Sequence, residues 1–189
     1  MQLPSPRTPI ARCEQISLYT QRMLQKFPNE AGLAGLDTML ATSTQTLMAT
    51  QSAYRDSVTA LIVVRVDVKF ADYVADKGVR QGQRFAQLAD GGSKGRFSSH
   101  LYPDGTTPIV RLVGESQVTE MKKLEGRYTS LVGTWSDAAT EGAKIAAFCL
   151  QYEGALFARK DAMQTSANRR AARDVAKEDF LEDSGSCVD

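Results

Sequence analysis

Apolar residues recur every three or four positions along most of this chain, a spacing that places them on one face of an α-helix. A short first helix is expected over 9–27, because Thr8 can cap a helix start, Pro9 suits the first helical position and Pro28 ends the pattern. A second helix is expected over 31–89, a stretch that contains no proline. The pattern therefore predicts one short helix followed by one very long helix.

Part of the long helix, residues 61–70, also fits a different structure. Val64, Val66 and Val68 alternate with charged residues, and a period of two in β-branched side chains is typical of a half-buried strand. Turn residues should bound a strand that lies within helical sequence, and none interrupts either flank of this segment. The helical interpretation is therefore preferred.

Residues 90–114 break the helical pattern and are expected to form a connection. The segment Gly91 to Gly95 is rich in glycine, and Pro103-Asp104-Gly105 is a strong turn signal. The residues on either side of that turn could pair as a short β-hairpin within 96–113, although an irregular loop fits them equally well.

The most regular pattern lies after the connection and predicts a helix, or a kinked pair of helices, over about 115–181. Gly133, followed by Ser136 and Asp137, is the place where a single helix would kink or divide, because Ser or Asp can cap a new helix. Residues 182–189 then form an acidic tail. The heptad positions are Met121, Leu124, Tyr128, Leu131, Trp135, Ala138, Gly142, Ile145, Cys149, Tyr152, Leu156 and Met163.

These elements predict a mainly all-α fold in a single domain over residues 1–189. Two long helices joined by one connection should lie antiparallel as an elongated hairpin or helical bundle, with the first helix packed alongside. Within the heptad stripe, a buried seam is expected to contain Tyr128, Trp135, Ile145, Tyr152 and Leu156.

Composition narrows the class of protein further. The chain has 189 residues, of which 42% are hydrophobic and 24% charged, an ordinary globular composition. The net charge of +1 provides no whole-molecule attraction to nucleic acid or anionic lipid. The first residues lack the apolar core of a secretory signal, and the longest apolar run, 60–64, is too short to cross a bilayer. A cytoplasmic location without membrane insertion is therefore expected.

Residue types that carry catalysis or bind metals are scarce. His100 is the only histidine, and no cysteine lies near it. The sequence therefore lacks the usual spacing of zinc ligands and a histidine placed to activate a nucleophile. Cys13 and Cys149 are expected to be small core residues, whereas Cys187 in the tail could be exposed. No enzyme activity, cofactor or metal is therefore predicted.

Charged residues supply the candidate interaction sites. Arg170 and Asp174 lie four residues apart within a basic stretch from Arg159 to Lys177, which favours a self-paired helix surface over a nucleic-acid site. The candidates form three groups, around the connection, in the basic stretch and in the tail: Lys77, Arg80, Arg84, Lys94 and Arg96; Arg169, Arg170 and Arg173; and Glu178, Asp179, Glu182 and Asp183.

The expected function is that of a structural or protein–protein interaction protein that self-assembles through its long helices. Its partner would be another copy or another protein, with the basic connection contacting the acidic tail of a neighbouring copy. One alternative is a nucleic-acid-binding or regulatory protein that uses the face from Arg159 to Lys177. A third hypothesis is a ligand pocket near His100 and Trp135.

Overall fold

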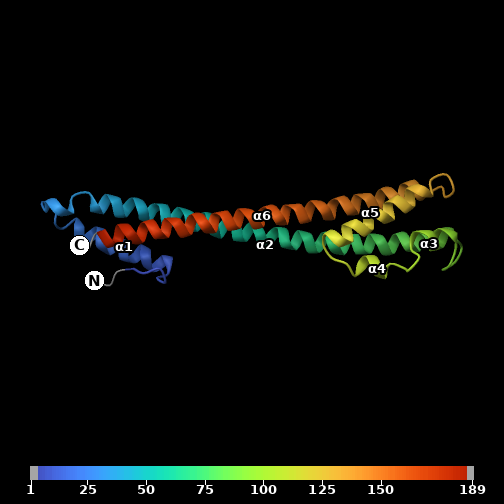
Figure 1. Ribbon diagram of the computed structural model, residues 1–189, viewed down its shortest axis with the longest axis horizontal. Coiled ribbons are helices and arrows are strands. Elements are labelled where there is room, and N and C mark those ends of the chain that lie inside the picture. Colours follow the sequence, from blue (N-terminus) through green and yellow to red (C-terminus); the bar gives the residue numbers. More distant parts are fainter. Residues whose placement is uncertain (1–3, 187–189) are drawn as a thin grey trace. The chain divides into compact units, whose positions relative to one another are not determined.

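The computed structural model describes residues 4–186, and within them the fold is all-α, as predicted: the chain is 80% helical and no strand is present (Figure 1). Cys187 and Asp189 lie outside the described residues. The helices in order are α1 (Ile10–Leu24), α2 (Leu36–Ala89), α3 (Arg96–Leu101), α4 (Thr107–Val110), α5 (Glu115–Ser130) and α6 (Ala138–Ser186), with a 3₁₀ turn at Ala31–Leu33.

The chain divides into two compact units, each described below by itself. The first contains residues up to Leu61 together with those from Ala162 onward, and the second contains Ile62–Asp161. The helices α2 and α6 each contribute one part to both units.

The start of α2 was predicted too early. The backbone of Gly35 has a φ of +82°, a conformation that L side chains rarely adopt, so the helix cannot begin before Leu36. From there α2 continues without interruption to Ala89, the predicted end. Residues 61–70 are helical, which confirms the helical interpretation over the strand.

In the first unit, α1 packs with the N-terminal part of α2 and the C-terminal part of α6. The core residues are Cys13, Leu40, Leu47, Ala176 and Phe180. Thr8 does not cap α1 as predicted, because Pro9 occupies the cap position and the Thr8 hydroxyl accepts a hydrogen bond from the Ser5 amide. The helix also ends earlier than predicted, at Leu24. Lys177 on α6 donates to the carbonyl oxygens of Pro6 and Thr8, at 2.7 and 2.8 Å, and so holds the segment before α1.

In the second unit, α5 and α6 form an antiparallel hairpin that packs on α2. The predicted region 115–181 is thus two helices, separated at Gly133, whose φ is +96°. Three contacts run along the hairpin from its turn: Tyr128 Cβ lies 2.9 Å from where a Cβ on Gly142 would stand, the Cys149 thiol lies 3.7 Å from the Val118 carbonyl oxygen, and the Gly114 amide donates to the Tyr152 hydroxyl at 2.7 Å.

The heptad seam is largely buried between these helices. Tyr128, Trp135, Ile145 and Tyr152 belong to the core, as predicted, whereas Leu156 is only partly buried. The seam continues through the turn because the two antiparallel helices bury their apolar faces on one another, so one continuous stripe in the sequence serves two helices. Both Cys13 and Cys149 are buried core residues, and burial raises the pKa of each thiol.

The connection contains helices rather than the β-hairpin considered for 96–113. Asp90 accepts hydrogen bonds from the amides of Phe97 and Ser98, at 2.9 and 2.7 Å, and so stabilises the start of α3. Desolvation of Asp90 opposes ionisation, but these hydrogen bonds outweigh it and lower the pKa of the carboxyl group. Pro108 lies in the first turn of α4, where its missing N–H costs nothing.

The acidic tail is also helical as far as it is described. Helix α6 continues to Ser186, because Phe180 and Ser184 are buried and the Ser184 hydroxyl donates to the Phe180 carbonyl at 2.7 Å. Glu178, Asp179, Glu182 and Asp183 are therefore presented on a helix.

Candidate interaction surface

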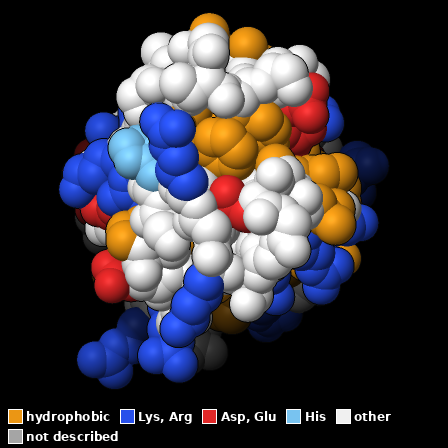
Figure 2. All heavy atoms as spheres, turned by 90° about the vertical axis from the view of Figure 1, so that its right-hand side faces the viewer, with side chains coloured by type: hydrophobic (Ala, Val, Ile, Leu, Met, Phe, Trp, Pro, Cys, Tyr) orange, Lys and Arg blue, Asp and Glu red, His pale blue; other side chains and the backbone are white. Residues whose placement is uncertain are grey.

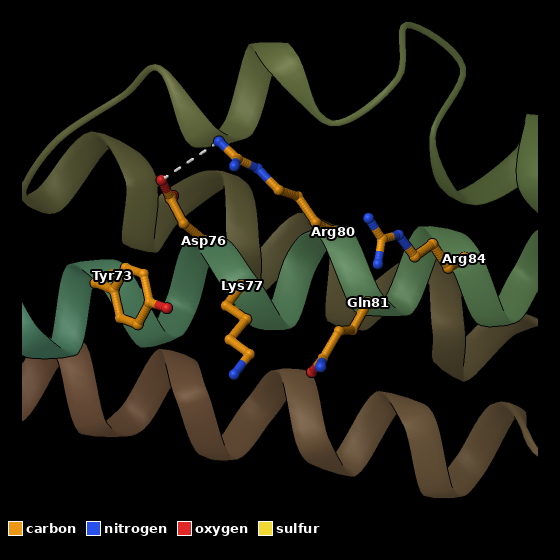
Figure 3. Close-up of a pocket in the computed structure, with 6 residues that line it drawn as sticks. All are labelled: Tyr73, Asp76, Lys77, Arg80, Gln81 and Arg84. Carbon is orange, nitrogen blue, oxygen red and sulfur yellow. Dashed lines mark ion pairs between the residues drawn. The ribbon is translucent and has the colours of Figure 1, made fainter.

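The structure separates the five basic residues that flank the connection. Lys77, Arg80 and Arg84 lie on one face of α2, where they line a shallow pocket of about 250 Å³ (Figure 3). Lys94 lines a different hollow of about 320 Å³ beside α3, and Arg96 is the first residue of α3. In Figure 2, which faces the end of the second unit, Lys and Arg side chains are spread around the rim instead of forming one patch.

We call Lys77, Arg80 and Arg84 the basic ridge. The remaining residues of its pocket are Tyr73, Asp76 and Gln81, all from α2 as well. Arg80 is 4.0 Å from Asp76, at the limit of an ion pair, and its side chain is 60% exposed. Lys77 and Arg84 have no ion pair among the described residues. The ridge therefore presents positive charge that the chain itself scarcely neutralises.

Asp76 joins this surface to α5. Its carboxylate accepts a hydrogen bond of 2.8 Å from the Gln117 side-chain amide. Burial and the nearby Asp72 raise the pKa of Asp76, while Gln117 and Arg80 act in the opposite direction. Gln117 is itself fully buried, and its Oε1 atom has no partner among the described residues.

The side chains of the pocket do not converge on a single point. In Figure 3, Asp76 and Arg80 point to one side of α2, whereas Lys77 and Gln81 point to the other, toward α6. A small-molecule site would be concave and would gather polar groups around one ligand. This arrangement is better suited to an extended contact along the helix.

Four large side chains continue the line of the basic ridge toward the N-terminus of α2. Val63, Val66, Phe70 and Tyr73 follow the same alternating spacing of three and four residues, and they are 55%, 60%, 59% and 62% exposed. We call these four residues the outer stripe. They lie opposite the side of α2 that contributes Val68, Ala71, Ala75 and Val79 to the core.

The outer stripe was not among the surfaces predicted from the sequence. Two of its members, Val66 and Phe70, belong to the strand-like alternation within 61–70, where apolar and charged residues alternate from Val64 onward. On a helix, that alternation leaves apolar side chains on two opposite faces, and only one of them faces the core. This segment has more apolar residues than one face of a helix can hold. That excess was the sequence signal from which the outer stripe could have been predicted.

Two of the four predicted acidic residues line a groove in the first unit. Asp179 and Asp183 border a hollow of about 360 Å³, together with Ala176 from α6 and Met39, Thr42, Ser43 and Thr46 from α2. Glu178 and Glu182 are exposed nearby on α6. Three of these acids, Glu178, Asp179 and Glu182, have no ion pair among the described residues.

The C-terminal part of the basic stretch proposed for nucleic acid is largely engaged within the first unit, whereas Arg159 and Lys160 belong to the second unit and are exposed. Arg173 contacts Asp174 and stacks over the Tyr54 ring, 4.6 Å from its centre. Arg170 is 3.9 Å from Asp174, and Lys177 is bound to backbone carbonyls. Arg169 remains exposed. Internal partners reduce the number of cations that this face could offer to phosphates.

His100 and Trp135 differ in their exposure to solvent. His100 is exposed, with Nε2 2.9 Å from the Ser130 hydroxyl, which in turn donates to the Arg127 carbonyl. Trp135 is buried and stacks on Phe97 with ring centres 5.4 Å apart. In the described part of the chain, no group of three or more His, Cys, Asp or Glu residues could hold a metal ion, and no helix is long and apolar enough to cross a membrane.

Comparison with known proteins provides no relative from which a function could be transferred: no family model, curated protein or solved structure matches this chain.

Proposed function

We propose that the protein is a structural or protein–protein interaction component that assembles with copies of itself through its long helices. The observation that carries the proposal is the outer stripe. A helix that covers one wall of a core normally has a polar opposite face, because exposed apolar side chains gain nothing from water. In the second unit, α2 instead has large apolar side chains on that face.

The character of the stripe supports contact with a helix or another regular surface. Isolated apolar residues are common on protein surfaces, whereas contiguous apolar patches tend to mark interaction sites. The alternation of three and four residues is the spacing by which one helix packs along another. The stripe is also free of glycine and proline, so its side chains lie on a regular helical backbone.

The proposal predicts that self-association depends on Phe70. Replacing Phe70 with Glu places a charge in the centre of the outer stripe, where burial against another molecule would be unfavourable. Because Phe70 is exposed in the chain, the fold should be retained. Sedimentation velocity over a range of concentrations should show assembly of the unmodified protein and a monomeric or much weaker assembly for Phe70→Glu.

Thr119→Glu is the matched control, since it adds the same charge at an exposed position on α5. This variant should sediment like the unmodified protein. If the unmodified protein remains a monomer at high concentration, self-assembly is not its function and the outer stripe has another role.

A further inference from the structure

The outer stripe is too small to be the whole of a stable contact. Its four side chains expose on the order of 400 Å² in total, whereas a stable interface buries roughly 800 Å² on each partner. The contact must therefore extend along α2. Toward the C-terminus of the helix, the next residues on the same line are Lys77, Arg80 and Arg84. A partner surface that extends in this direction therefore has to accommodate positive charge.

The first unit carries a surface of the opposite charge on α6. Glu178, Asp179 and Glu182 are exposed and without ion pairs among the described residues. Asp179 borders the groove between α6 and α2, whose other walls include the Met39 side chain and Ala176. Val175, one turn before Asp179, is 56% exposed. This part of α6 thus has an apolar residue followed by acids.

The order and spacing on the two helices match. On α2, Tyr73 is followed by Lys77 after four residues and by Arg80 after three more; on α6, Val175 is followed by Asp179 and Glu182 at the same intervals. A parallel alignment with a constant offset of 102 residues, taken from these positions, pairs all three. The same offset places exposed Ala172 beside Phe70.

We propose that the outer stripe of α2, together with Lys77 and Arg80 of the basic ridge, binds the segment from Ala172 to Glu182 of α6 in a second copy, with the two helices parallel. This inference rests on the proposed function and names its partner surface. Tyr73 meets Val175, Lys77 meets Asp179 and Arg80 meets Glu182. Lys77 and Arg80 point to opposite sides of α2, so they can hold the bound helix from both flanks (Figure 3).

The contact joins two different surfaces, so in a pair of copies one copy keeps its α6 segment free and the other keeps its α2 surface free. Such heterologous association gives a ring if the rotation between copies closes and a filament if it does not. Charge determines the direction and register of the contact, whereas the apolar residues supply most of the affinity. The register is specific enough to be tested by exchanging charges.

The test measures the association constant of the full chain by sedimentation at low salt, with circular dichroism as a check on folding. Arg80→Glu and Glu182→Arg should each weaken association by about tenfold, because each places like charges together. The double variant, which restores opposite charges in reversed order, should return to within about threefold of the unmodified protein. Arg84→Glu is the control, since the residue at the same offset is the uncharged Ser186, and it should have a smaller effect than Arg80→Glu.

Recovery in the double variant together with the weak effect of Arg84→Glu would support the inference. If the two single variants weaken association and the double variant does not recover, or if Arg84→Glu acts as strongly as Arg80→Glu, this pairing is wrong. In either case, assembly that still depends on Phe70 would leave the proposed function intact. If no assembly of the unmodified protein is detected, the inference and the proposed function fail together.

Discussion

Tyr102 and Tyr128 form a buried hydroxyl pair in the second unit. Their oxygen atoms are 3.1 Å apart, and both side chains are almost completely inaccessible to solvent. Burial raises the pKa of Tyr128 to about 12, with a smaller contribution from Glu141, although the hydrogen bond with Tyr102 acts in the opposite direction. Burial and the neighbouring Tyr128 raise the pKa of Tyr102 as well. Ionisation of either residue is therefore coupled to unfolding.

The pair should make the protein unstable at alkaline pH. Because the folded state holds these protons more tightly than the unfolded state, the unfolded chain ionises first, near pH 10. The contribution of the pair is complete below about pH 10 and falls as the pH rises toward 12, by up to about 1.4 kcal/mol per pH unit for each tyrosine. Urea unfolding at pH 8, 10 and 11 would measure this loss.

The double variant Tyr102→Phe with Tyr128→Phe is the control for that experiment. Removing both hydroxyls leaves no unpaired partner, so the cost at pH 8 should be small. Its stability should decline less steeply above pH 10 than that of the unmodified protein. If the stability of the double variant and of the unmodified protein declined equally above pH 10, the two hydroxyls would not be buried as described.

At the scale of the helices, close approach explains one glycine that the periodicity does not. Gly82 lies on the buried face of α2, and a Cβ at this position would stand 2.5 Å from the Tyr102 hydroxyl and 2.7 Å from the Tyr128 hydroxyl. The absence of a side chain lets α2 pack directly on this pair. By contrast, a Cβ on Gly126 in α5 would meet nothing within 4 Å.

Alanine at these two positions should have opposite effects. Gly82→Ala should lower the free energy of unfolding by about 1–3 kcal/mol, because the buried tyrosines have little room to move and overpacking outweighs the gain in helix propensity. Gly126→Ala should raise it by up to about 1 kcal/mol, since an exposed helical glycine is replaced by the best helix former. Chemical denaturation of both variants provides the comparison. A stabilised Gly82→Ala variant would show that the approach of α2 to the tyrosines is looser than described.

On the scale of the whole molecule, the two units differ in the size of their cores. Among the described residues, the first unit has a cluster of five buried hydrophobic residues, whereas the cluster of the second has eighteen. Apolar burial is the dominant favourable contribution to folding, and regions with fewer buried contacts open more readily. The first unit should therefore be the less stable of the two.

Hydrogen exchange can test this difference within a single helix. The amide of Leu47 on α2 should exchange faster than that of Val79 on the same helix, and the amide of Phe180 on α6 faster than that of Ile145. All four residues are buried, so exposure of the side chain does not explain the contrast. The measurement should be made at a concentration where sedimentation finds monomers, because assembly could protect the amides of the first unit from exchange. Equal protection at the paired positions would indicate that both units open together.

The local sequence was sufficient to determine the helical class and many of the boundaries. Periodicity predicted α2 to its final residue, and glycine marked the division between α5 and α6, because a backbone conformation reserved for glycine interrupts a helix whatever its surroundings. The groups of candidate charges were also visible in the sequence as local excesses of one sign. These features depend on neighbouring residues, so they could be predicted without knowledge of the fold.

Only the tertiary structure decided which surfaces remain available. The heptads from Met121 to Tyr152 fitted either one helix or a kinked pair, because two antiparallel helices share a single buried seam. The strand-like residues of 61–70 became the core-facing and outer faces of one helix, and Arg173 lies over the ring of Tyr54, a residue distant in sequence. Burial depends on residues distant in sequence, and that is the physical reason why the chain determined its helices while its packing selected the candidate surface.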